Sequence, residues 1–143
     1  MKKFLPLFLL LVFVACKKDG PKLVPENPAT KKVEYHVFAA KDYSHPIYAN
    51  VKAELRLQIR KINYKTGETE LLWDSSFATK NITEFPQYAG KIIIQKFYPV
   101  YESKEKLNGS YSVTYDDGGY ISQEGYADDV VPGEMSTLLE ADL

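Results

Sequence analysis

The chain has 143 residues, of which 45% are hydrophobic and 26% are charged, and its formal net charge is −1. This length and apolar content favour one globular domain over a disordered chain. The near-neutral charge argues against a nucleic-acid-binding protein, which normally carries a basic surface, and the single cysteine excludes an internal disulfide and a multi-cysteine metal site.

The N-terminal segment has the pattern of a secretory signal peptide. Lys2 and Lys3 are followed by an apolar run from Phe4 to Ala15. This run is too short for a stable membrane-spanning helix, because a span needs ~20 residues, but it fits the apolar part of a signal peptide. Charged residues follow directly after Cys16. We therefore expect residues 1–15 to be removed.

The segment resembles the signal peptide of a bacterial lipoprotein, in which a small residue precedes an essential cysteine. Ala15 and Cys16 match that pattern, whereas Phe13 and Val14 differ from its most common residues. The resemblance implies that Cys16 becomes an acylated N-terminus that inserts into the lipid bilayer. Because Lys17 stands where Asp retains many lipoproteins in the inner membrane, it also implies the outer membrane of the cell envelope. The alternative is an ordinary secretory signal with a cysteine near its cleavage site.

Residues 16–32 are expected to form the lipidated cysteine and a flexible tether. The stretch from Lys17 to Lys32 contains three prolines, one glycine and five lysines, with few apolar side chains to bury. Such a composition favours an extended, solvated spacer. The alternative is that these lysines contact anionic lipid head groups. The folded domain is then expected at residues 33–143.

The first half of this domain predicts strands and a hairpin. Apolar residues alternate with polar ones from Val33 to Ala39 and, most regularly, from Val51 to Arg60. A period of two places alternate side chains on opposite faces of a strand, so one face is expected to be buried and the other solvated. The turn residues Lys65 to Glu68 precede another apolar run at Glu70 to Trp73, which predicts a hairpin.

The second half continues the same pattern. Ile92 to Ile94 predict a strand that is covered on both faces, and Tyr111 to Tyr115 alternate again. Turns are expected at Asp116 to Gly119 and at Pro132-Gly133, with a last strand from Met135 to Leu143. One short helical turn is expected between Asn81 and Gln87. These elements predict an all-β domain, a single antiparallel β-sandwich of about seven or eight strands, with a lipocalin-like barrel as the alternative.

The stretch Leu107-Asn108-Gly109-Ser110-Tyr111-Ser112-Val113 resembles a strand entry of immunoglobulin-like and transthyretin-like sandwiches. In those families the tyrosine packs near a sheet corner. The resemblance favours a sandwich over a barrel. Because such folds carry many unrelated functions, it supplies no activity.

The sequence provides little support for catalysis. Its two histidines are His36, which is expected on the outer face of the first strand, and His45, which precedes a proline in a loop. Ser44 or Ser110 could be combined with them on paper, but no nucleophile motif such as G-x-S-x-G is present. Zinc-binding spacings, phosphate-binding loops and dinucleotide fingerprints are also missing. We therefore expect a protein that is not an enzyme and needs no cofactor.

Two acidic pairs offer a weak alternative as a metal site. They are Asp116-Asp117 and Asp128-Asp129, which flank one predicted strand. Calcium takes several carboxylate and carbonyl oxygens, but aspartate is also common in turns, where it accepts hydrogen bonds from nearby backbone groups. We expect no metal and retain calcium at these four residues as the alternative.

The domain is rich in tyrosine, a residue that can anchor protein interfaces and stack on sugar rings. The expected ligand-binding positions are Tyr98, Tyr101, Tyr120 and Trp73. The sequence thus favours a membrane-anchored envelope lipoprotein with a non-catalytic, protein-binding or assembly role that uses sheet edges or loops. The alternative is a carbohydrate-binding module that uses the exposed tyrosines. An envelope hydrolase or a hydrolase inhibitor is the weakest interpretation.

Overall fold

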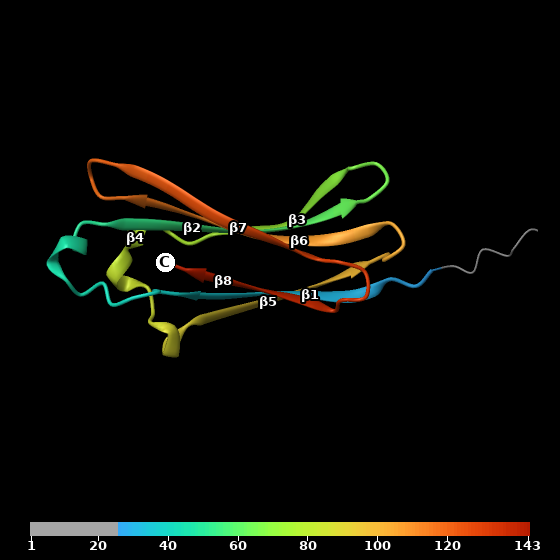
Figure 1. Ribbon diagram of the computed structural model, residues 1–143, viewed down its shortest axis with the longest axis horizontal. Coiled ribbons are helices and arrows are strands. Elements are labelled where there is room, and N and C mark those ends of the chain that lie inside the picture. Colours follow the sequence, from blue (N-terminus) through green and yellow to red (C-terminus); the bar gives the residue numbers. More distant parts are fainter. Residues whose placement is uncertain (1–25) are drawn as a thin grey trace, which may run out of the picture.

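The computed structural model describes residues 26–143, which form two facing β-sheets (Figure 1). The described chain contains eight strands and three short 3-10 turns. In chain order they are β1 (Ala29–Phe38), η1 (Pro46–Tyr48), β2 (Lys52–Asn63), β3 (Thr69–Ser76), β4 (Lys80–Asn81), η2 (Ile82–Glu84), η3 (Tyr88–Gly90), β5 (Ile92–Val100), β6 (Glu105–Asp116), β7 (Ile121–Val130) and β8 (Ser136–Asp142).

The strands are divided between a small and a large sheet. The small sheet has the order β5-β1-β8, and the large sheet has the order β3-β2-β6-β7, with the short β4 paired to β2. Neither sheet closes into a barrel, so the expected all-β sandwich is confirmed and the barrel alternative is wrong. One pair departs from the antiparallel expectation, because β8 runs parallel to β1 while the other strand pairs are antiparallel.

The core lies between the sheets and follows the alternation of the sequence. On β2 the side chains of Ala53, Leu55, Leu57 and Ile59 are fully buried, while the intervening residues point outward. The predicted hairpin is confirmed by the antiparallel pairing of β2 with β3. The expected helical turn is also present as η2. Its Asn81 cap accepts the N–H of Thr83 at 3.0 Å.

Tyr35 and Gly109 fit together at the centre of the core. The Tyr35 ring is fully buried, and its hydroxyl donates to the carbonyl of Gln58 at 2.6 Å. Gly109 lies on the facing sheet, where a Cβ atom would be 2.7 Å from Val33 Cγ1 and 2.8 Å from Leu139 Cδ1. The missing side chain therefore allows the two sheets to approach each other around the tyrosine.

Gly109→Ala should lower the free energy of unfolding by about 1–3 kcal/mol, because an added methyl group in a filled core forces its neighbours to move. Urea denaturation monitored by tryptophan fluorescence measures the change. Gly90→Ala is the matched control, since its Cβ would meet only Pro86 Cβ at an ordinary 3.7 Å. Equal stability of Gly109→Ala and the unmodified protein would show that the core has room at this position.

Two sequence-based expectations about strands are wrong. The folded domain begins at Ala29 rather than at residue 33, because β1 pairs with β5 from Ala29 onward and Lys31 is buried. The run from Ile92 to Ile94 is not covered on both faces. Ile93 is 53% exposed because it lies on the outer face of the two-layer sandwich, while Ile92 and Ile94 on either side are partly buried.

The sandwich has two ends with different loops. At the N-terminal end lie the start of β1 and the β2–β3, β5–β6 and β7–β8 turns, and at the far end lie the β1–β2 loop, η2, η3 and the β6–β7 turn (Figure 1). Because β8 is parallel to β1, the C-terminus also lies toward the far end. No helix within residues 26–143 is long and apolar enough to cross a membrane.

Candidate functional site: a tyrosine cleft at the far end

An open cleft with tyrosine walls occupies the far end of the sandwich. Its volume is about 210 Å³, less than the 300–1,000 Å³ of pockets that enclose drug-sized ligands. It therefore has room for one side chain or one sugar ring. The residues that line this tyrosine cleft are Tyr43, Tyr48, Val51, Ile82, Tyr115, Asp117, Tyr120 and Ser122.

The β1–β2 loop supplies one wall of the cleft. The rings of Tyr43 and Tyr48 pack edge to face with centroids 4.9 Å apart, a favourable aromatic geometry. Lys41 Nζ lies 5.2 Å and 5.0 Å from these two ring centroids, within cation–π range. His45 caps η1, since its Nδ1 lies 3.3 Å from the N–H of Ile47, so this histidine has a structural role in the loop.

The β6–β7 turn supplies the opposite wall. Asp117 Oδ1 accepts the N–H groups of Gly119 at 2.9 Å and of Tyr120 at 2.8 Å. These bonds hold the pKa of Asp117 below its ordinary value, so the cleft has a carboxylate at its rim. Gly118 adopts a left-handed φ of 87°, which the tight turn requires. The turn presents Tyr120 to solvent with 71% of its surface exposed.

The two acidic pairs of the sequence do not form one site. Asp116 and Asp117 lie in the β6–β7 turn, whereas Asp128 and Asp129 lie near the other end of β7. Asp128 accepts the hydroxyl of Thr137, and Asp129 forms an ion pair with Lys106. Within residues 26–143 no group of three acidic, histidine or cysteine side chains is placed to hold a metal ion.

The four aromatic residues chosen from the sequence are dispersed. Tyr120 lies at the tyrosine cleft, but Tyr101 lies in the β5–β6 turn at the N-terminal end, beneath Lys104. Tyr98 and Trp73 are half-buried and pack against the core, and the Trp73 ring lies 6.0 Å from that of Tyr35. Of these four residues, only Tyr120 lies beside other tyrosines of the cleft, of which Tyr43 is buried and Tyr48 and Tyr115 are half-buried.

Sequence reasoning missed the partners of Tyr120 in the cleft. Tyr43 and Tyr48 lie on either side of His45-Pro46 in an irregular loop, and Tyr115 shares the alternation of a strand. The only feature of the sequence that could have indicated the cleft is this pair of tyrosines on either side of a proline in a loop. Their proximity to Tyr115 and Tyr120 depends on the packing of loops that are distant in the chain, which the sequence pattern does not encode.

A polar hollow adjoins the cleft. Its volume is about 680 Å³, and the β1–β2 loop, the β4–η2 segment and the β6–β7 turn enclose it. Asn81 joins two of these segments, because its side-chain amide donates to the carbonyl of Ala49. The lining residues are Ala49, Asn50, Lys52, Thr79, Lys80, Asn81, Glu84, Asp116, Asp117 and Gly118.

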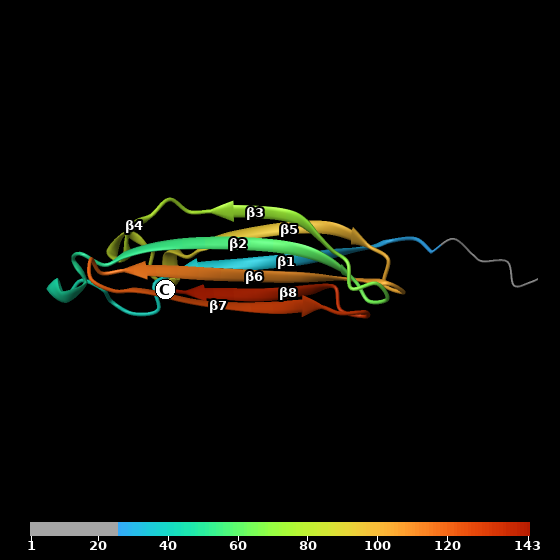
Figure 2. The same cartoon turned by 90° about the horizontal axis from the view of Figure 1, so that it is seen from above.

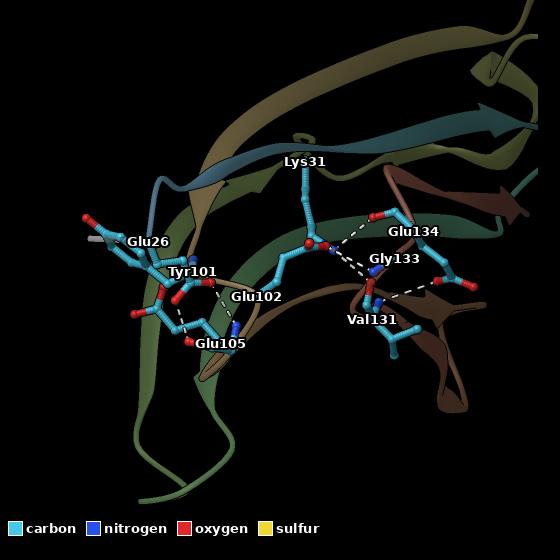
Figure 3. Close-up of polar contacts among 9 residues, drawn as sticks. Glu26, Lys31, Tyr101, Glu102, Glu105, Val131, Gly133 and Glu134 are labelled. Atoms are coloured by element: carbon cyan, nitrogen blue, oxygen red, sulfur yellow. Dashed lines mark hydrogen bonds and ion pairs between the residues drawn. The ribbon is translucent and has the colours of Figure 1, made fainter. Parts of the chain in front are cut away.

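An ion pair between a buried lysine and a partly exposed glutamate lies at the opposite, N-terminal end (Figure 3). Lys31 has no exposed side-chain surface, and its Nζ lies 2.6 Å from Glu102 Oε1. It also donates to the carbonyls of Val131 at 2.7 Å and Glu134 at 2.8 Å, while Glu102 accepts the N–H of Gly133 at 3.0 Å. These contacts connect the start of β1 to the β5–β6 and β7–β8 turns. Lys31 is therefore a structural residue of the domain rather than part of a solvated tether.

The outer face of the small sheet carries a polar cluster around His36, as expected from its phase on the strand. His36 Nε2 lies 2.8 Å from Glu34 Oε1. Hydrogen bonds from Lys32, which has the larger effect, and from His36 lower the pKa of Glu34 to about 2, although burial acts to raise it. Ser110 lies on the outer face of the other sheet, and Ser44 donates to Asp42 at 3.0 Å, so neither serine contacts His36.

The comparisons with known proteins return nothing for this chain: no family model, no curated protein and no solved structure matches it. The site is therefore interpreted from its residues alone.

Proposed function

We propose that the protein is a lipid-anchored lipoprotein of the bacterial cell envelope whose β-sandwich binds a protein partner without catalysing a reaction. The anchor is Cys16, which lies outside the described residues and is assigned from its sequence context. Two or more acyl chains hold a protein stably on a bilayer, at about 0.8 kcal/mol per buried CH₂. With Lys17 after the cysteine, we place the anchor in the outer membrane.

The distribution of exposed apolar side chains is the observation that carries this proposal. The three most exposed large apolar residues of the described chain are Tyr120 at 71%, Ile47 at 68% and Ile121 at 68%. All three belong to loops or strand starts at the far end, around the tyrosine cleft. Exposed apolar and aromatic side chains that gather at one place are typical of protein interfaces. The described chain begins at the opposite end, so an anchored molecule would present this surface away from its attachment.

A photo-reactive amino acid placed at position 120 in living cells tests the proposed binding surface. Position 120 is expected to cross-link to one defined envelope protein. Position 101 is the matched control, because Tyr101 is also an exposed turn tyrosine but lies at the N-terminal end. Cross-linking at 101 but not at 120 would contradict a partner surface at the far end.

Carbohydrate binding is the second candidate function, and the polar hollow beside the tyrosine cleft favours it. Tyrosine rings can stack on a sugar, and the amide of Asn50 and the carboxylate of Asp116 can form hydrogen bonds with its hydroxyls. This candidate gains support if position 120 yields no protein cross-link and the full-length protein is retained by a glycan array.

A further inference from the structure

The two sheets differ in width, and the large sheet extends past the small one beside β8. The large sheet is four strands wide, β3-β2-β6-β7, whereas the small sheet has only β5-β1-β8. Viewed from above, β7 lies beyond β8 along one side of the molecule (Figure 2). The place next to β8 and below β7 is therefore not filled by any strand of residues 26–143.

The inner face of β7 is uncovered at this place. Val130 is fully buried, so the residues that alternate with it along β7 point toward the small sheet. Tyr126 belongs to this face and lies 6.4 Å from the Tyr111 ring, yet 56% of its surface is exposed. Glu124, on the same face, is also exposed. A fourth strand in the small sheet would cover both side chains.

The backbone of β8 is available for such a strand. Leu143 donates to Phe38 at 2.9 Å and accepts from Ala40 at 2.7 Å, and Met135 accepts from Lys32 at 2.9 Å. Because backbone groups alternate between the two edges of a strand, the odd-numbered residues of β8 face β1. The N–H and C=O groups of Ser136, Leu138, Glu140 and Asp142 therefore point to the open edge.

The remaining edges are less suitable for strand addition. On β5, the inward Lys96 and Pro99, which has no backbone N–H to donate, make the edge less suitable for pairing. On β3, a bulge opposite Ile59 and Arg60 has the same effect. A strand added to β7 would extend the wider sheet and would have no second layer below it. The large sheet also extends past β5, since β3 lies beyond it (Figure 2), but there the inward Lys96 already lies over the Trp73 ring of β3, with Nζ 4.9 Å from the ring centroid. A strand on β8 would instead pack against a part of the facing sheet that, within the described chain, no side chain of the small sheet is seen to cover.

We infer that an extended segment of the protein partner, with Lys or Arg alternating with apolar residues, adds to β8 as a fourth strand of the small sheet. This inference rests on the proposed function and names the chemistry of its partner. The period of two places the apolar side chains of the segment against Tyr126 and its basic side chains beside the acidic residues of β8.

The charge of this side of the molecule selects a basic partner. Lys106 is the last basic residue of the chain, and residues 107–143 contain eight Asp or Glu residues and no Lys, Arg or His. Glu140 and Asp142 are exposed on β8 itself, where the basic side chains of the added strand would lie, while Glu124 on the inner face of β7 accepts the hydroxyl of Tyr115 at 2.7 Å. A second copy of this chain is a poorer occupant, because symmetric pairing of two β8 edges would bring like charges together.

Binding of synthetic peptides to the full-length protein in detergent micelles tests the inference. A fluorescent peptide of alternating Val and Lys is expected to bind, with an affinity that falls as salt is added. A peptide of alternating Val and Glu, with the same strand propensity, is the matched probe and is expected to bind at least tenfold more weakly. Equal affinity for the two peptides would overturn the basic partner.

The edge itself is tested with Leu138→Pro, which removes an outward N–H without removing a bond to β1. We expect it to weaken binding of the basic peptide at least tenfold, whereas Leu138→Ala should change it less than threefold. Hydrogen exchange of the unmodified protein is a second measurement that needs no variant. The amides of Leu138 and Glu140 should be protected by the peptide, and absence of protection would overturn strand addition.

Failure of this inference is distinguishable from failure of the proposed function. Cross-linking at position 120 without peptide binding would leave the binding surface intact and overturn the basic strand on β8. Concentration-dependent self-association that Leu138→Pro abolishes would also overturn it, because the occupant of the open place would then be a second copy of the chain.

Discussion

Lys31→Ala should lower the free energy of unfolding by about 2 kcal/mol, the largest stability loss that we expect from one side chain outside the apolar core. Lys31 is fully buried whereas 35% of the Glu102 side chain is exposed, so most of the loss comes from the carbonyls that lose their donor and from the packing of the lysine stem. Here Glu102 loses its counter-ion, and the carbonyls of Val131 and Glu134 lose their donor. The substitution also releases β1 from two turns at the N-terminal end.

Urea denaturation measures this loss, and Lys32→Ala is the matched control. Lys32 is next to Lys31 in the chain and also forms an ion pair, with Glu34, but 31% of its side chain is exposed. Its removal should therefore lower the free energy of unfolding by less than about 1 kcal/mol. Similar losses for the two variants would contradict the structural role of Lys31.

The same ion pair predicts a pH dependence. Lys31, and then the N–H of Gly133, hold the pKa of Glu102 below its ordinary value. The carboxylate therefore stabilises the fold above the pKa of an unfolded glutamate, ~4.3, and this contribution is lost as the pH falls toward the lower folded pKa. On acidification from pH 6 to pH 3, Lys31→Ala should lose less stability than the unmodified protein. An equal or greater loss would exclude the pair as the source.

The fold was predictable where one face of a strand is buried and the other is solvated. The alternation on β2 and the turn before β3 were sufficient to predict their hairpin, because period two and turn chemistry are local properties. The exposed outer face of β5 was not predictable. A run of isoleucines looks the same on a strand that is covered on both faces and on a strand of a two-layer sandwich, which is covered on one face only.

The candidate site was less predictable than the fold, for a physical reason. Tyr120 was identified because it follows a turn, but the cleft needs Tyr43 and Tyr48 from the β1–β2 loop. The burial of Lys31 was equally unpredictable, because its partners lie far along the chain: the two carbonyls are 100 and 103 residues away, and Glu102 belongs to the β5–β6 turn. Local composition indicated a solvated lysine, and tertiary packing made it a buried one.

Cys16→Ser should abolish the membrane attachment of the protein, an all-or-none effect. If the acylated Cys16 is the anchor, the variant cannot form the thioether that carries the lipid. Its acyl chains, each contributing about 0.8 kcal/mol per buried CH₂, are then lost. Lys17→Asp is the matched control beside it. By the resemblance to lipoproteins, this variant should keep its lipid and change only the membrane in which it is found.

We propose that the chain is held at a membrane by its N-terminus and binds a partner at the far end of the sandwich. Metabolic labelling with a clickable fatty acid, followed by the intact mass of the mature protein, tests the attachment most directly. We predict a mature chain that begins at Cys16, carries diacylglycerol and an added acyl chain, and is unlabelled in Cys16→Ser. An unmodified Cys16, or label that persists in Cys16→Ser, would contradict the account.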